Sequence, residues 1–409
     1  MSDTRRIERI AIGEIIDWVL QQGLYGTHFE TLLVQMCEKL VAAGVPLWRV
    51  NFSMRTLHPE IGAFAYRWKR QIGIEHETFD RNVAYSVNHD WAISPLKALM
   101  EGEALEMRHR LSEDQKPFPF PMFDDLLSQG ATDYFATQAV FDPDYAGFSI
   151  EEVRSGGMVI SWTSDGPGGF SDADLDAIRR LMPAIALALK SNGMEQMADD
   201  LLAAYLGADA ARRVMSGSIS RGSVDTIEAV ILYFDLSGFT KLSEALPGPE
   251  IIDLLNAYFG AVVPLIEERG GNVLKFMGDG MLAIFARDTV PDTEATAVDA
   301  ICAIRDTVND ISATRASEGL AQTGCTMSAH AGTVLYGNIG APSRLDFTVI
   351  GPAVNTAARI NAMSAHVDQP IVIGSNVARP LLGTRSDLVS MGQYRLRGVR
   401  DRQELFTLD

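Results

Sequence analysis

The chain has 409 residues, of which 47% are hydrophobic and 22% are charged. This usage is typical of ordinary globular domains and excludes wholesale disorder, and the length predicts two or three domains. With 53 acidic and 35 basic side chains the formal net charge is −18. Because nucleic-acid binding depends on a basic surface, this charge argues against a nucleic acid as partner.

The cysteines and the N-terminal residues indicate the cellular compartment of the protein. Cys37, Cys302 and Cys325 are odd in number and widely spaced. Such a set fits neither a disulfide framework nor a cysteine-based zinc site, so we expect reduced thiols and a cytoplasmic protein. The apolar stretch in residues 1–20 is broken by Glu14 and Asp17. We therefore expect no signal peptide, and no apolar run approaches the roughly 18 residues of a membrane span.

The N-terminal part of the chain mixes helix and strand patterns. We expect an N-terminal helix over residues 1–27, and apolar residues at helical spacing predict another over 29–43. Alternating residues over 47–55 and 61–68 predict an antiparallel strand pair. We expect a short helix over 95–100, and three more strands over 103–110, 133–141 and 157–163. After a turn at 164–170, Ser171 with Asp174 predicts the cap of a helix in which Pro183 introduces a kink.

This order of elements over residues 28–191 resembles a GAF-type sensory domain. A PAS-type domain is an alternative, and so is a dimerisation domain that binds no ligand. The resemblance implies an unidentified small-molecule or protein signal at this domain. Residues 192–221 predict a connecting helical linker, interrupted at Gly207. Such a linker either pairs across a dimer or packs on its own domain, and a few turns of periodicity do not separate the two.

A strand that ends in a carboxylate opens the C-terminal part. The continuous apolar run 228–234 predicts a central strand, and Asp235 follows it directly. The next residues, 236–240, form a glycine-containing turn that opens a helix. A carboxylate at a strand end suits a divalent cation, and the backbone N–H groups of 236–240 can face phosphate oxygens.

A second acid follows a long helix that begins near Pro249 and ends at Gly270. Two short apolar strands, 272–276 and 281–285, flank the sequence MGDG and predict a hairpin with Asp279 at its tip. An acid at a hairpin tip is common for backbone reasons alone. Together with Asp235, however, it supplies two carboxylates at neighbouring strand ends, the minimum for binding Mg²⁺ or Mn²⁺ together with substrate phosphates.

The third group of polar residues follows a strand over 326–336 and another over 347–351. Pro352 opens a helix on which Asn355 and Arg359, four residues apart, share one face. Such a pair can orient a ribose and neutralise a phosphoryl group, or it can be a first-turn asparagine and a solvated surface arginine. Arg397 lies between a strand and Gly398, a position from which it could reach a phosphate.

Five motifs occur in the order and at the spacing of one family. They are FDLSGFT (234–240), KFMGDGMLAIF (275–285), HAGTVLYGNIG (330–340), FTVIGPAVNTAARI (347–360) and LRG (396–398). Over residues 222–409 the chain resembles the class III nucleotidyl cyclase catalytic domain. The resemblance implies a ferredoxin-like α+β domain, preceded here by the α+β sensory domain.

The resemblance also implies a role for each matching residue. Asp235 and Asp279 match the aspartates that hold two divalent ions, Mg²⁺ or Mn²⁺, in each site. Asn355 and Arg359 match the ribose-positioning and transition-state residues. The turn that meets the triphosphate corresponds to Leu236, Gly238, Phe239 and Thr240, and Arg397 stands where the family often has a lysine.

Lys275 and Thr348 match the residues that select the purine. A lysine ammonium can only donate a hydrogen bond, and N1 of adenine accepts one whereas N1–H of guanine donates. Thr348 can accept from the exocyclic amine. The resemblance therefore implies an adenylate cyclase with ATP as substrate, and guanylate cyclase activity is the alternative. Pro352 replaces an Asp or Asn that is frequent in the family, so the helix should persist without that side chain's hydrogen bond.

In this family the two aspartates come from one subunit, and the purine-selecting, Asn and Arg residues come from the other. The present chain carries each of these residues once. The resemblance therefore implies a head-to-tail homodimer with two equivalent sites. A catalytically silent partner of another cyclase is an alternative, although such chains usually lose an aspartate or the arginine, and this chain retains them.

Overall fold

The computed structural model describes residues 2–55, 61–80, 93–101, 104–141, 157–218 and 220–409. The chain forms two compact units, Met1–Leu201 and Leu202–Asp409. The α+β class expected for both parts is confirmed. The finer boundaries after residues 27, 191 and 221 stay predictions.

An antiparallel sheet of six strands, in the order β3-β2-β1-β6-β5-β4, forms the centre of the N-terminal unit. The strands are β1 (Leu47–Arg55), β2 (Ile61–Lys69), β3 (Gly73–Asp80), β4 (Glu106–Arg110), β5 (Asp133–Val140) and β6 (Gly157–Ser164). The predicted strands agree with this arrangement; residue 103 of one of them lies outside the described residues. The polar strand β3 has no counterpart in the prediction because it is a largely exposed edge strand.

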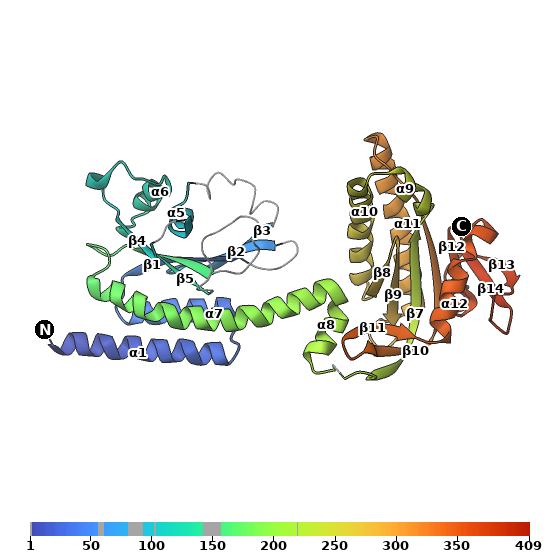
Figure 1. Cartoon of the computed structure of the whole chain (residues 1–409), viewed down its shortest axis with the longest axis horizontal. Coiled ribbons are helices and arrows are strands. Elements are labelled where there is room, and N and C mark those ends of the chain that lie inside the picture. The colour runs from blue at the N-terminus through green and yellow to red at the C-terminus, as the bar shows by residue number, and fades with distance from the viewer. Residues whose placement is uncertain (1, 56–60, 81–92, 102–103, 142–156, 219) are drawn as a thin grey trace. The chain divides into compact units, whose positions relative to one another are not determined.

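Helices cover both faces of this sheet (Figure 1). The helices α1 (Ser2–Leu24), α2 (Phe29–Ala42) and α7 (Asp172–Leu206) contribute to the larger apolar core on one face. On the other face α5 (Pro95–Glu101) and α6 (Met122–Ser128) enclose a smaller core. The alternation of β1 places Val50, Phe52 and Met54 in the larger core.

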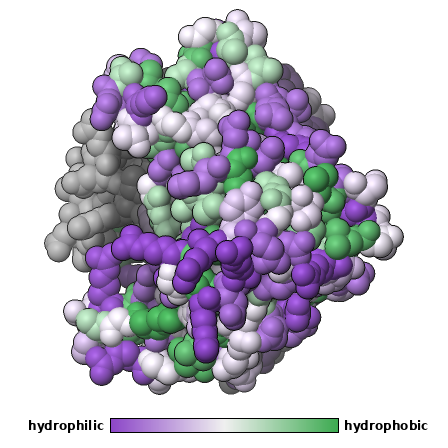
Figure 2. Space-filling model, turned by 90° about the vertical axis from the view of Figure 1, so that its right-hand side faces the viewer, coloured by the Kyte–Doolittle hydropathy of each residue, from purple (hydrophilic) through white to green (hydrophobic). Residues whose placement is uncertain are grey.

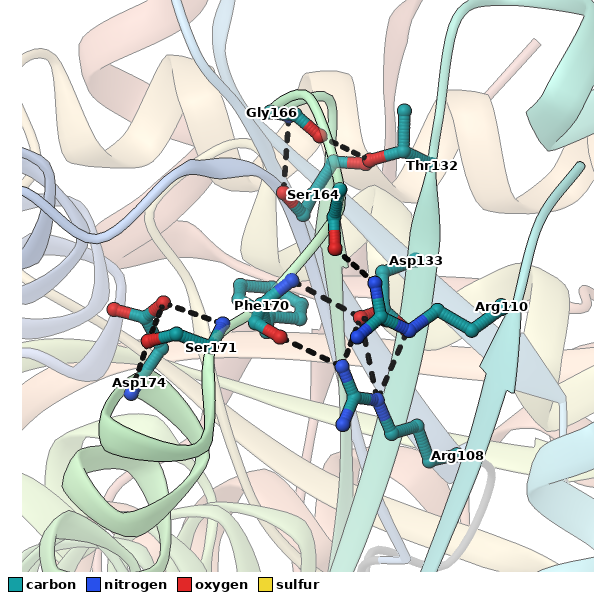
Figure 3. Close-up of polar contacts among 10 residues, drawn as sticks. Arg108, Arg110, Thr132, Asp133, Ser164, Gly166, Phe170, Ser171 and Asp174 are labelled. Carbon is teal, nitrogen blue, oxygen red and sulfur yellow. Dashed lines mark hydrogen bonds and ion pairs between the residues drawn. The ribbon is translucent and has the colours of Figure 1, made fainter.

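A buried carboxylate fixes the segment that leads into α7 (Figure 3). Asp133 is 0% exposed and accepts hydrogen bonds from Nη2 of Arg108 at 2.6 Å and from the backbone N–H of Phe170 at 3.0 Å. Gly169, with φ of 71°, passes so close that a Cβ there would lie 2.5 Å from Oδ2 of Asp133. Glycine is therefore required at this position both for its backbone angle and for space.

The predicted cap of α7 is confirmed. The Ser171 N–H donates to Oδ2 of Asp174 at 2.8 Å, and the Asp174 N–H donates to Oγ of Ser171 at 3.2 Å. The helix continues through Pro183 to Leu206, so residues 192–206 extend α7 and do not begin a new helix. Gly207, with φ of 84°, then separates α7 from α8 (Ala208–Met215), as expected.

The C-terminal unit is built on an eight-stranded sheet. Its path is β13-β14-β12-β10-β7-β9-β8, and β11 pairs with β10. The strands are β7 (Val224–Leu236), β8 (Asn272–Met277), β9 (Gly280–Ala286), β10 (Cys325–Ala341), β11 (Arg344–Ile350), β12 (Ile371–Gly374), β13 (Leu388–Tyr394) and β14 (Gln403–Leu408). As predicted, β7 is central and buried, and β8 and β9 form a hairpin.

The two faces of this sheet carry different helices (Figure 1). The long helices α10 (Gly248–Glu267) and α11 (Thr293–Ser317) pack on one face, and α12 (Pro352–Asn361) packs on the other. The shorter helices are α9 (Phe239–Ala245), α13 (Ser364–Val367) and α14 (Ser375–Ala378). No helix was predicted over α11, whose apolar residues are mostly small and poorly segregated.

Among the described residues, only α10 is long and apolar enough, by length and composition, to cross a bilayer. In this structure its Leu254, Tyr258, Val262 and Ile266 are buried in the core of the C-terminal unit. One side of α10 therefore packs in the core, and 22% of its apolar stretch is buried. On the face of the molecule shown in Figure 2, hydrophilic side chains predominate and the hydrophobic ones form small, separate patches.

Candidate active site

The structure brings the two predicted metal-binding aspartates together at one end of the sheet. Asp235 lies near the end of β7, directly opposite Gly280 of β9, and Asp279 is the residue before Gly280. A hydrogen bond from the Leu236 N–H to the Asp279 carbonyl, 3.2 Å long, joins the two turns. Gly278 has φ of 70°, as expected for the first central residue of a type II′ hairpin turn. Asp279 therefore occupies the tip of the hairpin, as predicted.

Gly280 is a site residue that the sequence analysis missed. A Cβ at this position would lie 2.7 Å from Oδ1 of Asp235 and 2.9 Å from the Phe234 carbonyl oxygen. The absence of a side chain therefore makes room for the Asp235 carboxylate. The pattern Gly-Asp-Gly could have suggested this role, but either glycine could equally have served the hairpin turn alone.

The two acids influence each other electrostatically. Burial, with the added negative charge of Asp279, raises the pKa of Asp235 to about 6. A divalent cation between the two carboxylates would relieve this repulsion. Among the residues that the structure describes, no group of three or more His, Cys, Asp or Glu side chains is placed to hold a metal. The oxygen donors of the pair suit Mg²⁺ or Mn²⁺, with water and phosphate oxygens as the remaining ligands.

Only part of the turn after Asp235 can offer its amides to a phosphate. The N–H of Leu236 is bonded to Asp279, and the N–H of Ser237 donates to the Gly324 carbonyl at 2.9 Å. The expectation that the amides of Leu236 and Ser237 face phosphate is therefore wrong, because each already donates a hydrogen bond within the protein. The N–H groups of Gly238, Phe239 and Thr240 have no backbone acceptor in the described part of the chain.

The predicted purine-selecting residues occupy β8 and β11, which are not paired with each other in the sheet. Lys275 on β8 lies opposite Leu282, which belongs to the core on the α12 side of the sheet. Its ammonium is 3.9 Å from Oδ2 of Asp346 on β11, the strand that also carries Thr348. Thr348 is 7% exposed, and its hydroxyl oxygen is buried without a hydrogen-bond partner. Native proteins usually satisfy a buried hydroxyl of this kind with a protein group, an ordered water or a ligand.

The helix α12 presents the remaining pair. Pro352 occupies its first turn, as predicted, and Asn355 is exposed while Arg359 is partly buried. A Cβ on Gly398 would lie 3.2 Å from Nη2 of Arg359, so the turn containing Arg397 lies beside this guanidinium. The side chain of Arg397 is exposed.

The predicted residues fall into two groups according to the elements that carry them. Asp235 and Asp279 make one group; Lys275, Thr348, Asn355, Arg359 and Arg397 lie on β8, β11, α12 and the β13–β14 connection. Within the described ranges, no side chain of the second group forms a hydrogen bond or ion pair with either aspartate.

Comparison with known proteins identifies this unit. Residues 223–409 match the family model described as the adenylate and guanylate cyclase catalytic domain. The C-terminal part of the chain belongs to this cyclase family. An adenylate cyclase of Anabaena cylindrica is 34% identical over 165 residues, which are 40% of this chain and 33% of that protein. An uncharacterized protein of Mycobacterium tuberculosis (strain ATCC 25618 / H37Rv) is 32% identical over 193 residues, covering 47% of this chain and 33% of that one.

The chain thus spans about a third of the length of these curated relatives. Among solved structures, the adenylyl cyclase CyaB from P. aeruginosa aligns with a TM-score of 0.43 and 24% identity, covering 46% of this chain and 96% of that one. The guanylyl cyclase Cya2 aligns with a TM-score of 0.40 and 28% identity, covering 45% and 93%.

The N-terminal unit contains a cavity of about 630 Å³ that the sequence analysis did not locate. Its walls include Phe29, Phe64, Tyr66 and His76, and the rings of Tyr66 and His76 stack with centroids 4.5 Å apart. His76 belongs to β3, which was not predicted as a strand. The cavity could therefore not be assembled from the sequence pattern.

Proposed function

We propose that the protein is an adenylate cyclase that converts ATP to 3′,5′-cyclic AMP and pyrophosphate. The observation that carries the proposal is the carboxylate pair, Asp235 and Asp279, held together by the β7 end, the β8–β9 turn and the space left by Gly280. Lys275 and the unpartnered hydroxyl of Thr348 favour adenine, because they offer one donor and one acceptor to its edge. The adenylate cyclase of Anabaena cylindrica is a relative that supports the same substrate.

The proposed reaction is an attack of the ribose 3′-oxygen on the α-phosphorus, with pyrophosphate as the leaving group. Divalent ions on the two carboxylates would make the 3′-hydroxyl more acidic and neutralise phosphate charge. The amides of Gly238, Phe239 and Thr240, together with Arg397, would bind the triphosphate. Asn355 would orient the ribose, and Arg359 would stabilise the charge that develops on the α-phosphoryl group.

We further propose that two copies of the chain complete each site in a head-to-tail homodimer. The match of residues 223–409 to the cyclase family, whose catalytic assembly is dimeric, supports this arrangement. The exposed side chains of Phe276 and Met277, 53% and 40% accessible, lie on the same hairpin as Asp279 and suit a protein contact.

Turnover assays with ATP and with GTP, each with Mg²⁺ or Mn²⁺, test the substrate. We expect cyclic AMP from ATP, and loss of about 10²–10³-fold in rate for Arg359→Ala. Preferred turnover of GTP would replace this proposal with guanylate cyclase activity. No turnover of either nucleotide by the purified full chain would favour a catalytically silent partner.

Mixing two inactive variants tests the dimer. Asp279→Ala and Arg359→Ala each damage one half of every site. After equal mixing, half of the dimers are mixed, and each has one intact site of two, so activity should return to about a quarter of wild type. If the mixture stays inactive although the chains exchange, the site does not form between copies.

Residues 28–191 are proposed to be a GAF-like or PAS-like sensory domain that regulates the catalytic unit through the following helix. A truncated chain that keeps both its activity and its response to cell metabolites would contradict this role. The three cysteines are unpaired, which suits a reducing compartment, and we propose a cytoplasmic location.

A further inference from the structure

The cavity of about 630 Å³ in the N-terminal unit, which we call the aromatic cavity, has a floor of cross-strand neighbours. Tyr66 of β2 pairs in register with His76 of β3. In the next row Phe64 of β2 pairs with Met54 of β1 and with Thr78 of β3. All five residues line the cavity. Because residues two apart on a strand share a face, strand register alone assembles this floor.

Helices form the walls of the aromatic cavity. The turn between α1 and α2 contributes one wall and α7 contributes another. A hydrogen bond from Nδ2 of Asn192 on α7 to the Thr27 carbonyl, 2.7 Å long, joins the two walls. Leu24 and Tyr25 also line the cavity and are 84% and 72% exposed, so the cavity is open to solvent. A molecule can therefore enter a site whose floor and walls are already in place.

A glycine within α7 preserves the volume of the aromatic cavity. Gly193 lies inside the helix, where glycine is less favourable than alanine. A Cβ at this position would meet only Cε of Met54 within 4 Å, at the ordinary contact distance of 3.4 Å. Neither a positive φ nor a close neighbour therefore requires glycine here. A larger side chain would extend into the cavity, because Gly193 is one of its lining residues.

The charges around the aromatic cavity are negative. Asp199 and Asp200 of α7 line it, and none of the lining residues that the structure describes is Lys or Arg. A third carboxylate acts on the aromatic floor, since burial raises the pKa of Tyr66 and the negative charge of Glu30 adds to that rise. Aromatic rings present a negative face to a cation, and carboxylates attract the same charge. This combination of groups suits a cation and disfavours an anion.

We infer that the aromatic cavity binds a small organic cation, an ammonium ion that carries an apolar body. The ammonium group would lie toward Asp199 and Asp200, and the apolar body would pack on the rings of Phe29, Phe64 and Tyr66. A volume of about 630 Å³ lies within the usual range of small-molecule sites. The inference adds a ligand class to the proposed sensory role, but binding depends neither on that role nor on cyclase activity.

Three probes with one apolar body test the inference on the full chain. They are the phenethylammonium ion, neutral phenethyl alcohol and the anion hydrocinnamate, and their binding is followed by ligand-observed NMR titration. The cavity lining also contains His28 and His76, so the titrations are made at about pH 8, where histidine side chains are ordinarily uncharged. We expect the ammonium ion to bind wild type with a Kd on the order of 1 mM, the alcohol to bind about tenfold more weakly, and the anion not to bind.

Two substitutions with matched controls locate the binding. Gly193→Leu fills the cavity; its control is Gly13→Leu on α1, where a Cβ meets nothing within 4 Å and the residue does not line the cavity. Gly193→Leu should abolish binding of the ammonium ion while its Tm equals or exceeds that of wild type, since a helix glycine is replaced. Asp199→Asn should weaken binding of the ammonium ion about threefold and leave the alcohol unchanged. Its control, Asp125→Asn, is exposed on α6 and should bind as wild type does.

Four results would overturn the inference. The first is that the alcohol or the anion binds wild type as tightly as the ammonium ion, because the cavity would then not select a cation. The second is that none of the three probes binds. Wild-type affinity in a folded Gly193→Leu chain would place the binding outside the cavity. Equal weakening by Asp199→Asn and Asp125→Asn would show that the attraction comes from the net charge of the chain and not from this site.

Discussion

The substitution Gly280→Ala tests the geometry of the carboxylate pair. The new Cβ would lie 2.7 Å from Oδ1 of Asp235, whereas ordinary contacts begin at 3.4 Å, so the carboxylate must move by about 0.7 Å. The second close atom, the Phe234 carbonyl oxygen at 2.9 Å, belongs to the backbone of a central strand and cannot move independently. The side chain of Asp235 therefore has to take up most of the displacement.

A displacement of this size should reduce the turnover rate much more than the stability of the fold. Misplacing a reacting group by about 1 Å can cost roughly 10²-fold in rate, and overpacking costs about 1–3 kcal/mol of stability. We expect Gly280→Ala to fold, with a lower Tm, and to lose about 10²-fold in turnover of ATP. Binding of Mn²⁺, followed by electron paramagnetic resonance, should weaken in parallel because the same carboxylate is displaced.

The matched control is Gly383→Ala, since a Cβ at residue 383 meets nothing within 4 Å. It should bind Mn²⁺ and turn over ATP as the wild-type chain does. Wild-type Mn²⁺ affinity in Gly280→Ala would refute the argument that this glycine makes room for the Asp235 carboxylate. Weakened binding in both variants would show that the loss is not specific to the site.

Three further substitutions test other parts of the structure. The pKa of Asp235, about 6, is higher in the folded chain than in an unfolded one, so the ionised Asp235 side chain destabilises the fold above about pH 6, and this destabilisation disappears toward pH 4. Asp235→Asn should therefore raise Tm at about pH 7.5 but not at about pH 4.5, and added Mn²⁺ should stabilise the wild-type chain but not the variant. A Tm of Asp235→Asn below that of wild type at about pH 7.5 would contradict this argument. Thr348→Val removes a buried hydroxyl without a partner, so it should stabilise the free protein by about 1 kcal/mol in urea unfolding while raising KM for ATP, and unchanged KM would count against base recognition. Asp133→Asn disrupts the buried pair with Arg108 and should cost about 3 kcal/mol of unfolding free energy; a loss below about 0.5 kcal/mol would show that the pair does not stabilise the fold.

Local sequence patterns were sufficient for the elements that bear the cyclase motifs. The buried run of β7, the Gly-Asp-Gly turn after β8 and Pro352 at the start of α12 each combine a local signal with a local structure. The cap formed by Ser171 and Asp174 and the break at Gly207 are of the same kind. Where a few adjacent residues determine the backbone conformation, the local sequence is enough to predict that conformation.

Elements whose structure depends on distant partners were not predicted. The edge strand β3 is polar because most of its side chains are exposed, and α11 buries small residues such as Ala297 and Ala300 against a sheet that other segments build. Neither has a clear period of its own. The structure of β3 and α11 is determined by the strands and helices against which they pack.

By itself, the sequence determined that two carboxylates follow neighbouring strand ends, and it determined the family to which residues 223–409 belong. Only the tertiary structure decided that Gly280 must lack a side chain, that the Leu236 amide is already bonded, and that burial and the charge of Asp279 raise the pKa of Asp235. The physical reason is that space, hydrogen-bond satisfaction and local charge depend on atoms brought together from separate strands. Register between strands, which no local pattern specifies completely, controls all three.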